Sequence, residues 1–410
     1  MKKYVIIGNG TAAVGCIEGI RTLDKEGVIT VISAENHPVY SRPLISYYLE
    51  GRTDPVRMRY RPEDFYEKNG CAVYYGARAL SIDPEKKAVV LDSGETLGYD
   101  RLCVAAGSRP FVPRFEGLEK VRDKFSFMTL DDAFALEKAL NRDARVLIVG
   151  AGLIGLKCAE GIKERAASIT VCDLADRVLS SILDADCAAI VQDHLEKCGI
   201  SFMLGDTAVR FEENRAFMKS GAEVDFDILV LAVGVRANTE LAKDAGGNVN
   251  RGIITDIQCQ TSLPDVYAAG DCAEGYDSSI GTNRVLAILP NAYMQGRTAG
   301  VNMAGGKEVF DNALPMNSIG FFGLHIMTAG SYDGEMTEEK ENGNIKRFFV
   351  KDGILKGFIL IGDTGRAGIY TSLIREKTPL DTVDFELTKK AATNLIFSQK
   401  TRRQKFGGVV

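Results

Sequence analysis

Two glycine-rich segments are the parts of this chain best suited to chemistry. Each follows an apolar run that predicts a buried parallel strand, and each precedes a stretch that predicts a helix. In such a turn the first glycine bends the chain tightly, the second lets the backbone approach a pyrophosphate, and the third position allows close helix–strand packing. The pyrophosphate then faces free N–H groups and the positive end of the helix dipole. The candidate binding residues are Gly8, Gly10, Thr11, Ala12 and Ala13 in the first segment and Gly150, Gly152, Leu153, Ile154 and Gly155 in the second.

Each glycine-rich turn is followed, one strand later, by an acidic residue. The strand at 28–32 leads to Glu35, and the strand at 168–172 leads to Asp173. A carboxylate at this position accepts hydrogen bonds from ribose hydroxyls, so both segments are complete dinucleotide-binding units. A 2′-phosphate beside Asp173 would be repelled by up to roughly 4 kcal/mol at about 4 Å and an effective dielectric of about 20. If this segment binds a nicotinamide cofactor, NADH is therefore expected in preference to NADPH, although Arg177 is near enough to restore some use of NADPH. Two such units on one chain indicate that one cofactor passes electrons to the other.

The composition limits the classes of protein to which the chain can belong. Its 410 residues exceed what one hydrophobic core organises, so two or three domains are expected. A net charge of −5 gives no global positive field for nucleic acid. No run of about 18 apolar residues is present, so no membrane span is expected. The apolar stretch after Met1 stops at Gly8 and is interpreted as a strand, which predicts a cytoplasmic protein.

The nine cysteines and three histidines are scattered along the chain. The cysteines form no C-x-x-C pair, which argues against a zinc site, an iron–sulfur cluster within this chain or a disulfide framework. Most are expected to be small buried hydrophobic residues, and Cys16 is expected to pack inward from the first helix. The histidines are interpreted as structural, and no metal site is predicted.

The order of the elements predicts that one nucleotide-binding domain is inserted in the other. Two apolar strands that each end in a glycine turn, at 100–110 and 227–236, mark the two crossings, where the chain enters and leaves the inserted domain. Later, two strands flank an Asp352-Gly353 turn. The predicted fold class is α/β, with two Rossmann-like three-layer domains and a small α+β C-terminal domain. The predicted boundaries are 1–110 with 237–311 for the discontinuous domain, 111–236 for the inserted one, 312–380 for the α+β domain, and 381–410 for a tail with a short helix and a basic end.

Five further motifs resemble those of a known protein family. They are Tyr40–Ser46 (YSRPLIS), Gly155–Lys157, Ala268–Ala273, Leu289–Ala292 and Ile361–Gly365. Together with the two turns, they resemble the FAD-dependent pyridine nucleotide-disulfide oxidoreductases over roughly residues 1–380. Within that superfamily, the chain looks most like the NADH:rubredoxin reductases and the flavin portion of NADH-nitrite reductases. The resemblance implies that the discontinuous domain binds FAD and the inserted domain binds NADH.

The resemblance also implies additional cofactor residues. Asp271 would contact the ribityl or pyrophosphate region of FAD. Asn291 and Ala292 would open a helix aimed at the flavin pyrimidine ring, where a helix N-terminus stabilises negative charge. Arg42 and Ser46 would lie along the cofactor. The implied set is completed by Pro43, Ala106, Gly107 and Gly234, at loops and strand ends.

Two departures from the family pattern bear on the reaction. Disulfide and peroxide chemistry need a thiolate beside the flavin, but residues 36–51 contain no cysteine. Oxygenase-coupled ferredoxin reductases pair a lysine with a glutamate there, and those positions are Tyr47 and Lys157 here. Our hypothesis is that Lys157 lies near flavin N5 and the nicotinamide and favours reduced flavin. The alternative is a solvated helix lysine. Tyr47 and Lys157 are the candidate catalytic residues.

These observations predict an NADH-dependent FAD oxidoreductase that passes electrons to a small iron–sulfur carrier, either rubredoxin or a ferredoxin-like protein. The alternatives are an NADH oxidase that uses oxygen, a non-catalytic flavoprotein, and a flavoprotein subunit of a larger redox complex. Basic residues at 389–390 and 400–405 are either a docking patch for an acidic carrier or a solvated end. The 312–380 segment is a dimer interface in some relatives, so a homodimer is also considered.

Overall fold

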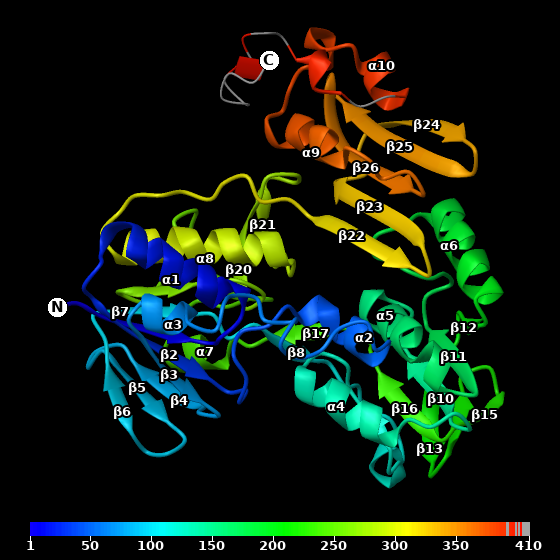
Figure 1. The fold of residues 1–410 in the computed structure, drawn as a ribbon, viewed down its shortest axis with the longest axis horizontal. Helices are drawn as coiled ribbons and strands as arrows, with labels where there is room; N and C mark the ends of the chain where they lie inside the picture. Colours follow the sequence, from blue (N-terminus) through cyan, green and yellow to red (C-terminus); the bar gives the residue numbers. More distant parts are fainter. Residues whose placement is uncertain (391–392, 398–399, 401, 404–410) are drawn as a thin grey trace. The chain divides into compact units, whose positions relative to one another are not determined.

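The computed structural model describes residues 1–390, 393–397, 400 and 402–403. The chain divides into two compact units (Figure 1). Residues 1–275 with 289–310 form the first, and residues 276–288 with those from 311 onward form the second. Among the described residues, no helix is long and apolar enough to cross a membrane.

The first nucleotide turn grows out of a parallel five-stranded sheet with the order β19-β7-β1-β2-β3. Its strands are β1 Lys3–Ile7, β2 Val28–Ser33, β3 Cys71–Tyr75, β7 Arg101–Val104 and β19 Val266–Ala268. The apolar strand β1 is buried from Tyr4 to Ile7, as a parallel strand covered on both faces must be. Because β19 follows the whole second sheet in sequence, the first sheet is assembled from both sides of an insertion, which confirms the predicted nesting.

Helices α1 Thr11–Leu23 and α8 Leu289–Met303 pack on one face of this sheet and lie side by side (Figure 1). Glycines allow their close approach. A Cβ at Gly15 would lie 2.2 Å from the carbonyl oxygen of Tyr293, and one at Gly300 would lie 2.1 Å from that of Cys16. Cys16 itself is fully buried, as predicted. The start of α1 is therefore held in place by α8 as well as by the sheet.

The second sheet repeats the plan, with five parallel strands in the order β12-β11-β10-β16-β9. The strands are β9 Lys124–Phe125, β10 Arg145–Val149, β11 Ser168–Asp173, β12 Ser201–Leu204 and β16 Ile228–Leu231, with helices α4 Leu130–Ala139, α5 Leu153–Ile162 and α6 Ala185–Lys197. A capping box starts α4, because Thr129 and Asp132 each accept a hydrogen bond from the other's backbone N–H. Leu130, Ala133 and Leu136 recur at helical spacing and are the buried residues of this helix.

Smaller elements complete the first unit. Strands β4 Ala79–Asp83, β5 Ala88–Leu91 and β6 Thr96–Gly98 form one antiparallel sheet, and β13 Ala208–Glu212, β14 Arg215–Met218 and β15 Glu223–Asp225 form another. The two predicted crossings meet where β8 Ser108–Pro110 pairs with β17 Val235–Ala237. The remaining elements are η1 Arg42–Leu44, α2 Ile45–Leu49, α3 Phe65–Lys68, η2 Leu118–Lys120, η3 Lys163–Arg165, α7 Glu240–Asp244, β18 Ile253–Ile254 and β20 Ala273–Asp277.

The second unit is built on an antiparallel five-stranded sheet with the order β22-β23-β26-β25-β24. Its elements are β21 Thr282–Arg284, β22 Met316–Phe321, β23 Leu324–Gly330, β24 Glu335–Glu341, β25 Asn344–Lys351, β26 Ile354–Ile361, α9 Ala367–Arg375, η4 Leu380–Thr382, α10 Phe385–Lys390 and η5 Asn394–Ile396. Strands β25 and β26 are the predicted pair. Asp352 and Gly353 both have positive φ between them, as a tight hairpin requires.

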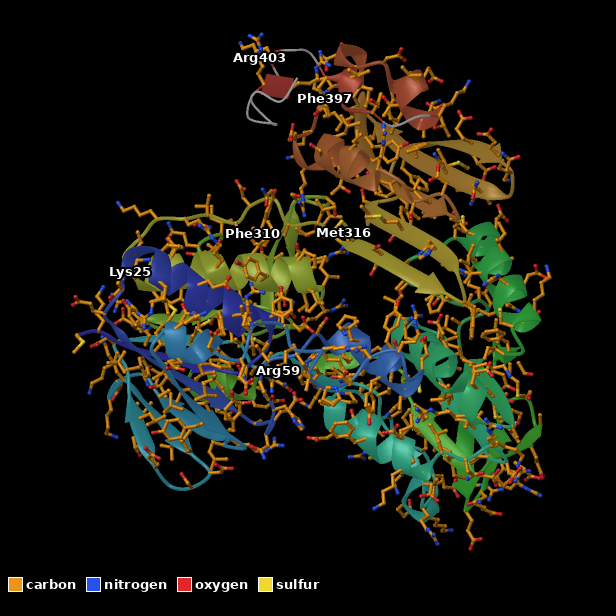
Figure 2. The ribbon with its side chains drawn as sticks, in the orientation of Figure 1. Lys25, Arg59, Phe310, Met316, Phe397 and Arg403 are labelled. Atoms are coloured by element: carbon orange, nitrogen blue, oxygen red, sulfur yellow. The ribbon has the colours of Figure 1, made fainter. Side chains whose placement is uncertain are left out.

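Some residues of the described tail contribute to the core of the second unit. The Tyr370 hydroxyl donates a hydrogen bond to the Thr388 carbonyl oxygen at 2.8 Å, and Ile396 and Phe397 are buried in the same apolar cluster (Figure 2). Lys389 is only 8% exposed and pairs with Glu386. Lys389 is therefore not part of a solvated end, whereas Lys390, Lys400 and Arg403 are exposed. Thr401, Gln404 and Lys405 of the predicted basic end lie outside the described residues.

Candidate functional site

The first glycine-rich turn forms a cradle at the start of α1. Gly8 has a φ of +113°, and a Cβ there would lie 2.1 Å from the Ala105 carbonyl oxygen, so only glycine fits. At Gly10 no atom lies within 4 Å of an added Cβ. Gly10 is also the N-cap residue of α1, makes no side-chain cap, and is followed by a first turn without acidic residues. The first N–H groups of α1 and the open space at Gly10 together offer a place for an anion.

A pocket of about 920 Å³, part of it open to solvent, extends from this cradle. Its lining includes ten of the predicted cofactor residues: Gly8, Gly10, Thr11, Ala12, Glu35, Arg42, Ala106, Gly107, Asp271 and Ala292. Ala13 and Asn291 are fully buried, and Pro43 is exposed at the start of η1, so these three do not line the pocket. An anion cradle with two carboxylates, Glu35 and Asp271, in the same pocket lining suits a dinucleotide, so the residues present fit FAD. Lining residues missed by the sequence analysis include Asn9, His37, Tyr40, Ser108 and Met128.

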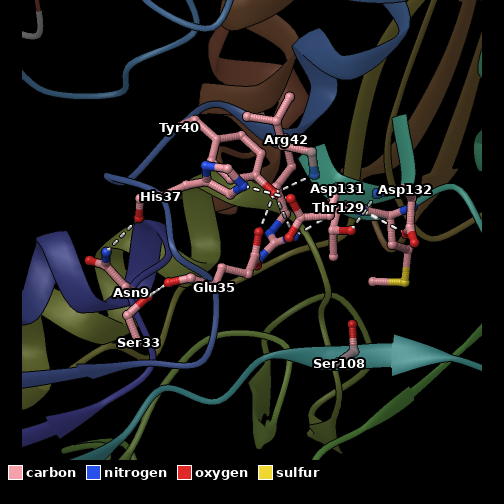
Figure 3. A network of polar contacts seen from close by, with 12 residues as sticks. Asn9, Ser33, Glu35, His37, Tyr40, Arg42, Ser108, Thr129, Asp131 and Asp132 are labelled. Carbon is pink, nitrogen blue, oxygen red and sulfur yellow. Dashed lines mark hydrogen bonds and ion pairs between the residues drawn. The ribbon is translucent and has the colours of Figure 1, made fainter. Parts of the chain in front are cut away.

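A polar network fixes Glu35 and Arg42 at one end of the pocket (Figure 3). Arg42 forms an ion pair with Glu35 and donates to the Met128 carbonyl oxygen at 3.1 Å. The Tyr40 hydroxyl donates to Glu35 at 2.6 Å and accepts from the Leu130 N–H at 2.9 Å. Burial raises the pKa of the Tyr40 phenol, which keeps its proton available for Glu35. Both predicted residues line the pocket, and the backbone groups of Met128 and Leu130, which lie outside the Tyr40–Ser46 motif, complete the network that orients them.

The same network joins the loop at 35–42 to the start of α4. His37 Nε2 lies 2.7 Å from Asp131 Oδ1, and Met128 and Leu130 supply the backbone groups bound by Arg42 and Tyr40. Loop and helix are 90 residues apart in sequence at the Tyr40–Leu130 contact. The wall of the first pocket therefore continues directly into the segment that leads to the second sheet.

Asp271 lies at another part of the pocket lining, on the turn after β19. Gly270, with a φ of +80°, donates its N–H to the buried Gln295 side chain at 2.9 Å, which fixes this turn against α8. The Ser108 hydroxyl donates to Asp271 at 3.2 Å. Burial raises the pKa of Asp271, while the Ser108 hydrogen bond and the positive charge of Arg42 oppose that rise. A half-buried carboxyl in the pocket lining is suited to accepting hydrogen bonds from a ligand hydroxyl.

The second glycine-rich turn has the same backbone geometry. Gly150 has a φ of +117°, and a Cβ there would lie 2.3 Å from the Ala232 carbonyl oxygen. At Gly155 a Cβ would lie 2.0 Å from the Gly150 carbonyl oxygen, so α5 packs directly on its own turn. Gly152 and Gly234 have no atom within 4 Å of an added Cβ, and Leu153 and Ile154 form the first turn of α5. This turn is a second anion cradle.

Asp173, at the end of β11, is held by backbone amides. Its carboxylate accepts from Ala151 N at 2.7 Å and from Ala175 N at 2.8 Å. Nearby, Arg177 pairs with Asp176 at 2.7 Å and donates to the Leu183 carbonyl oxygen at 3.4 Å. Asp173 is therefore oriented at the glycine-rich turn, while Arg177 has partners on its own loop.

The two candidate catalytic residues contact each other. The Lys157 ammonium lies 4.8 Å from the centroid of the Tyr47 ring and forms an ion pair with Glu160, one turn along α5. The Arg52 guanidinium lies 4.6 Å from the same ring. Lys157 is 17% exposed, so it is not a solvated helix lysine. Its charge is balanced by Glu160, a neighbour that the sequence analysis did not consider.

Helices α2 and α5 are in close contact beside this cluster. A Cβ at Gly161 would lie 2.9 Å from the Ser46 carbonyl oxygen. Ser46 is 1% exposed, its hydroxyl donates to the Pro43 carbonyl oxygen at 3.3 Å, and it is not among the residues that line the pocket. The prediction that Ser46 lies along the cofactor therefore finds no support, because α5 covers this residue.

The cysteines are placed for packing. Seven of the nine are buried, and Cys71 and Cys198 are partly exposed. Burial raises the pKa of the Cys172 and Cys272 thiols to about 12, which disfavours a thiolate. None of the cysteines is among the residues that line the first pocket. In the described part of the chain, no group of three or more His, Cys, Asp or Glu side chains could hold a metal ion.

Comparison with known proteins defines the class. Residues 2–296 match the pyridine nucleotide-disulphide oxidoreductase model, and residues 315–378 match the rubredoxin NAD+ reductase C-terminal domain. The chain belongs to the pyridine nucleotide-disulphide oxidoreductase family, whose members use FAD and NADH. It is therefore an NAD(P)H-dependent flavoprotein oxidoreductase.

Particular relatives refine this class. The chain is 31% identical over 392 residues to the NADH-dependent phenylglyoxylate dehydrogenase subunit epsilon of Aromatoleum evansii, covering 92% of each chain. It is 30% identical over 402 residues to the assimilatory nitrate reductase electron transfer subunit of Bacillus subtilis, covering 95% of this chain but only 50% of that relative. A solved covalent complex of putidaredoxin reductase with putidaredoxin contains a chain with a TM-score of 0.88 at 24% identity, covering 96% of this chain and 97% of that one. The last likeness concerns the fold alone.

Proposed function

We propose that this chain takes electrons from NADH and passes them, through bound FAD, to a small iron–sulfur protein. The observation that carries the proposal is the presence of two glycine-rich nucleotide turns together with a rubredoxin-reductase-type C-terminal domain. When bound, FAD accepts an electron pair from NADH and releases electrons singly to a carrier. Rubredoxin is the first candidate carrier, and a ferredoxin-like protein is the second.

The first pocket is the proposed FAD site. Gly8 and Gly10 let the backbone approach the pyrophosphate, and the first N–H groups of α1 donate to it. Glu35, oriented by Tyr40 and Arg42, accepts from the adenosine ribose. Asp271, on the turn after β19, accepts from the ribityl chain.

The second turn is the proposed NADH site. Gly150, Gly152 and the start of α5 bind the pyrophosphate, and Asp173 accepts from the ribose hydroxyls. Because Asp173 already faces the turn and carries a negative charge, a 2′-phosphate is repelled and NADH is preferred over NADPH. Arg177 has partners on its own loop and so adds little affinity for that phosphate.

The cluster of Tyr47, Lys157 and Glu160 is proposed to position the two sites. It joins α2, which follows the FAD loop, to α5, which follows the NADH turn. Electron transfer between two cofactors requires them to be held at close range, so a rigid contact between these helices contributes through geometry. Because Glu160 balances Lys157, the electrostatic contribution of Lys157 is smaller than that of an isolated cation.

A second candidate is a flavoprotein subunit of a larger redox complex. It is favoured by the likeness, over 92% of both chains, to a subunit named as NADH-dependent. The same chemistry would then serve a dedicated partner rather than a diffusing carrier. A cytoplasmic location and a homodimer remain expectations from the sequence.

The test is steady-state turnover of the FAD-loaded protein with NADH and three acceptors in parallel: rubredoxin, a ferredoxin, and oxygen. Faster reduction of an iron–sulfur carrier than of oxygen is expected. Oxygen uptake that is equally fast without a carrier would instead identify an NADH oxidase. Rapid flavin bleaching with no turnover on any of the three would favour a dedicated partner. Gly152→Val, which should fill the NADH cradle, is the inactive control.

A further inference from the structure

A second pocket in the first unit shares Pro38 with the FAD pocket and contains no predicted site residue among those that line it. The space between its lining residues is about 510 Å³, part of it open to solvent. Apolar and aromatic surface comes from Pro38, Tyr66 and Tyr75. Charge comes from Arg59, Arg61 and Glu63. This mixture of flat surface and guanidinium groups is unlike a packing defect, which would be apolar throughout.

The two arginines are held in different ways. Arg61 makes a two-pronged ion pair with Glu18, at 2.7 and 3.1 Å, so its guanidinium is fixed. Arg59 lies 2.9 Å from Glu63, whose side chain is 84% exposed. Such an exposed pair contributes little free energy, so an incoming anion can replace Glu63 at Arg59 at small cost. Arg59 is labelled on its loop in Figure 2.

The two tyrosines differ in the same way. The Tyr66 hydroxyl donates to Asn9 Oδ1 at 2.6 Å and accepts from Val39 N at 3.3 Å, which fixes its ring. Tyr75, at the end of β3, is 40% exposed, and its ring is perpendicular to that of Tyr66 with centroids 6.4 Å apart. An exposed tyrosine beside a fixed one leaves aromatic surface on which a flat ring can stack.

We propose that this pocket binds a planar aromatic anion, meaning an aromatic ring that carries one carboxylate or phosphate group. The ring packs on Tyr75 and Pro38, and the anionic group binds Arg59 in place of Glu63. The aromatic side of the pocket thus has one fixed residue, Tyr66, and one that is available to the ligand, Tyr75. The charged side likewise has a fixed residue, Arg61, and an available one, Arg59.

The pocket is also tied to the FAD loop through the backbone. Ser41 N donates to the Met58 carbonyl oxygen at 2.8 Å, and Tyr60 N donates to that of Val39 at 3.0 Å. The segment at 58–60 therefore pairs with the loop at 38–41, which carries residues lining both pockets. A ligand that orders one segment orders the other, so we expect the aromatic anion and FAD to favour each other's binding.

The experiment is calorimetric titration of the FAD-saturated protein with benzoate and with phenyl phosphate. We expect both probes to bind, and Arg59→Ala and Tyr75→Ala each to weaken binding about tenfold, the loss of one charge-assisted hydrogen bond or one stacking contact. Tyr75→Phe should keep the affinity, since the ring remains. Arg57→Ala is the matched control, because Arg57 is 76% exposed, pairs with Asp54 and is not among the residues that line the pocket.

Several results would overturn the proposal. One is that neither probe binds the wild-type protein. Another is that Arg59→Ala and Tyr75→Ala both leave the affinity unchanged. Benzyl alcohol binding as tightly as benzoate would remove the role of the anion. Binding to the apoprotein that disappears on saturation with FAD would show that the probes enter the first pocket instead. The FAD content of each variant verifies that it is folded.

Discussion

The two glycine-rich turns have nearly the same backbone but are stabilised differently. Gly8 and Gly150 have φ values of +113° and +117°, and in each case an added Cβ would collide with a carbonyl oxygen of a neighbouring strand end. Gly10 and Gly152 both face open space. The difference lies in the acids: the side chains of Tyr40 and Arg42, on the same loop, orient Glu35, whereas backbone amides beside the turn orient Asp173. The second turn is self-contained, and the first depends on contacts that reach α4.

The third position of the motif differs for a related reason. Ala13 is accommodated in the first turn, where α1 also packs against α8 through pairs of glycines. Gly155 in the second turn is required because α5 lies directly on the Gly150 carbonyl. The same motif therefore tolerates a methyl group where a second helix shares the packing and excludes it where the turn packs on itself.

The largest effect is expected at this third position. Gly155→Ala places a Cβ 2.0 Å from the Gly150 carbonyl oxygen, so the turn must shift, and NADH-driven flavin reduction should fall about 100-fold. Ala13→Gly in the first turn should cost only about 0.5–1 kcal/mol of stability and leave FAD bound. Single-turnover kinetics measure the rate of flavin reduction by NADH, and the FAD content measures whether the cofactor stays bound. Equal losses of NADH reduction in both variants would contradict the contrast.

Substitutions of the two acidic residues should separate coenzyme specificity from FAD retention. Asp173→Asn removes a negative charge while keeping an acceptor, so the ratio of kcat/KM for NADH over NADPH should fall by at least about tenfold. Glu35→Gln should weaken FAD retention and leave that ratio unchanged. Steady-state kinetics with both nucleotides and flavin release on dilution test this pair. A change of coenzyme preference in Glu35→Gln would argue that the two sites are assigned in reverse.

A moderate effect is expected from the cluster that joins α2 to α5. Lys157→Met should slow flavin reduction about tenfold, because a cation over an aromatic ring and its ion pair are both lost. In a double-mutant cycle, Tyr47→Leu and Lys157→Met should couple by about 0.5–1 kcal/mol in the activation free energy. Tyr47→Phe is the control that keeps the ring. Additive effects would mean that the contact plays no part in positioning.

The smallest effect concerns the pH dependence of stability in the apoprotein. Burial raises the pKa of Asp271, so the folded state binds its proton more tightly than the unfolded state does. The stability contribution is then complete below the unfolded pKa of about 4 and is lost as pH rises through the folded pKa. Asp271→Asn should remove that decline, so the variant gains stability relative to wild type towards neutral pH while losing FAD affinity. Parallel melting curves at all pH values would contradict this.

Local patterns in the sequence predict much of this structure. The apolar strands, both glycine turns, the helix at 130–141 and the Asp352-Gly353 hairpin follow from periodicity and turn chemistry acting over a few residues. What could not be predicted depends on contacts between distant residues. The Lys157–Glu160 pair is a local i,i+3 contact on α5, which helical spacing could have predicted. The contact between Arg42 and the Met128 carbonyl oxygen, in contrast, spans 86 residues of sequence. Burial of Phe397 likewise gives no local signal.

The central claim is that electrons enter from NADH bound at the second glycine-rich turn and leave through FAD bound at the first. Anaerobic stopped-flow tests it most directly. The FAD-loaded protein is mixed with NADH, then with oxidised rubredoxin or ferredoxin, while flavin absorbance is followed. We predict fast bleaching by NADH and fast recovery of the oxidised flavin on mixing with a carrier. A flavin that NADH does not bleach, or one that recovers only when oxygen is admitted, would contradict the account.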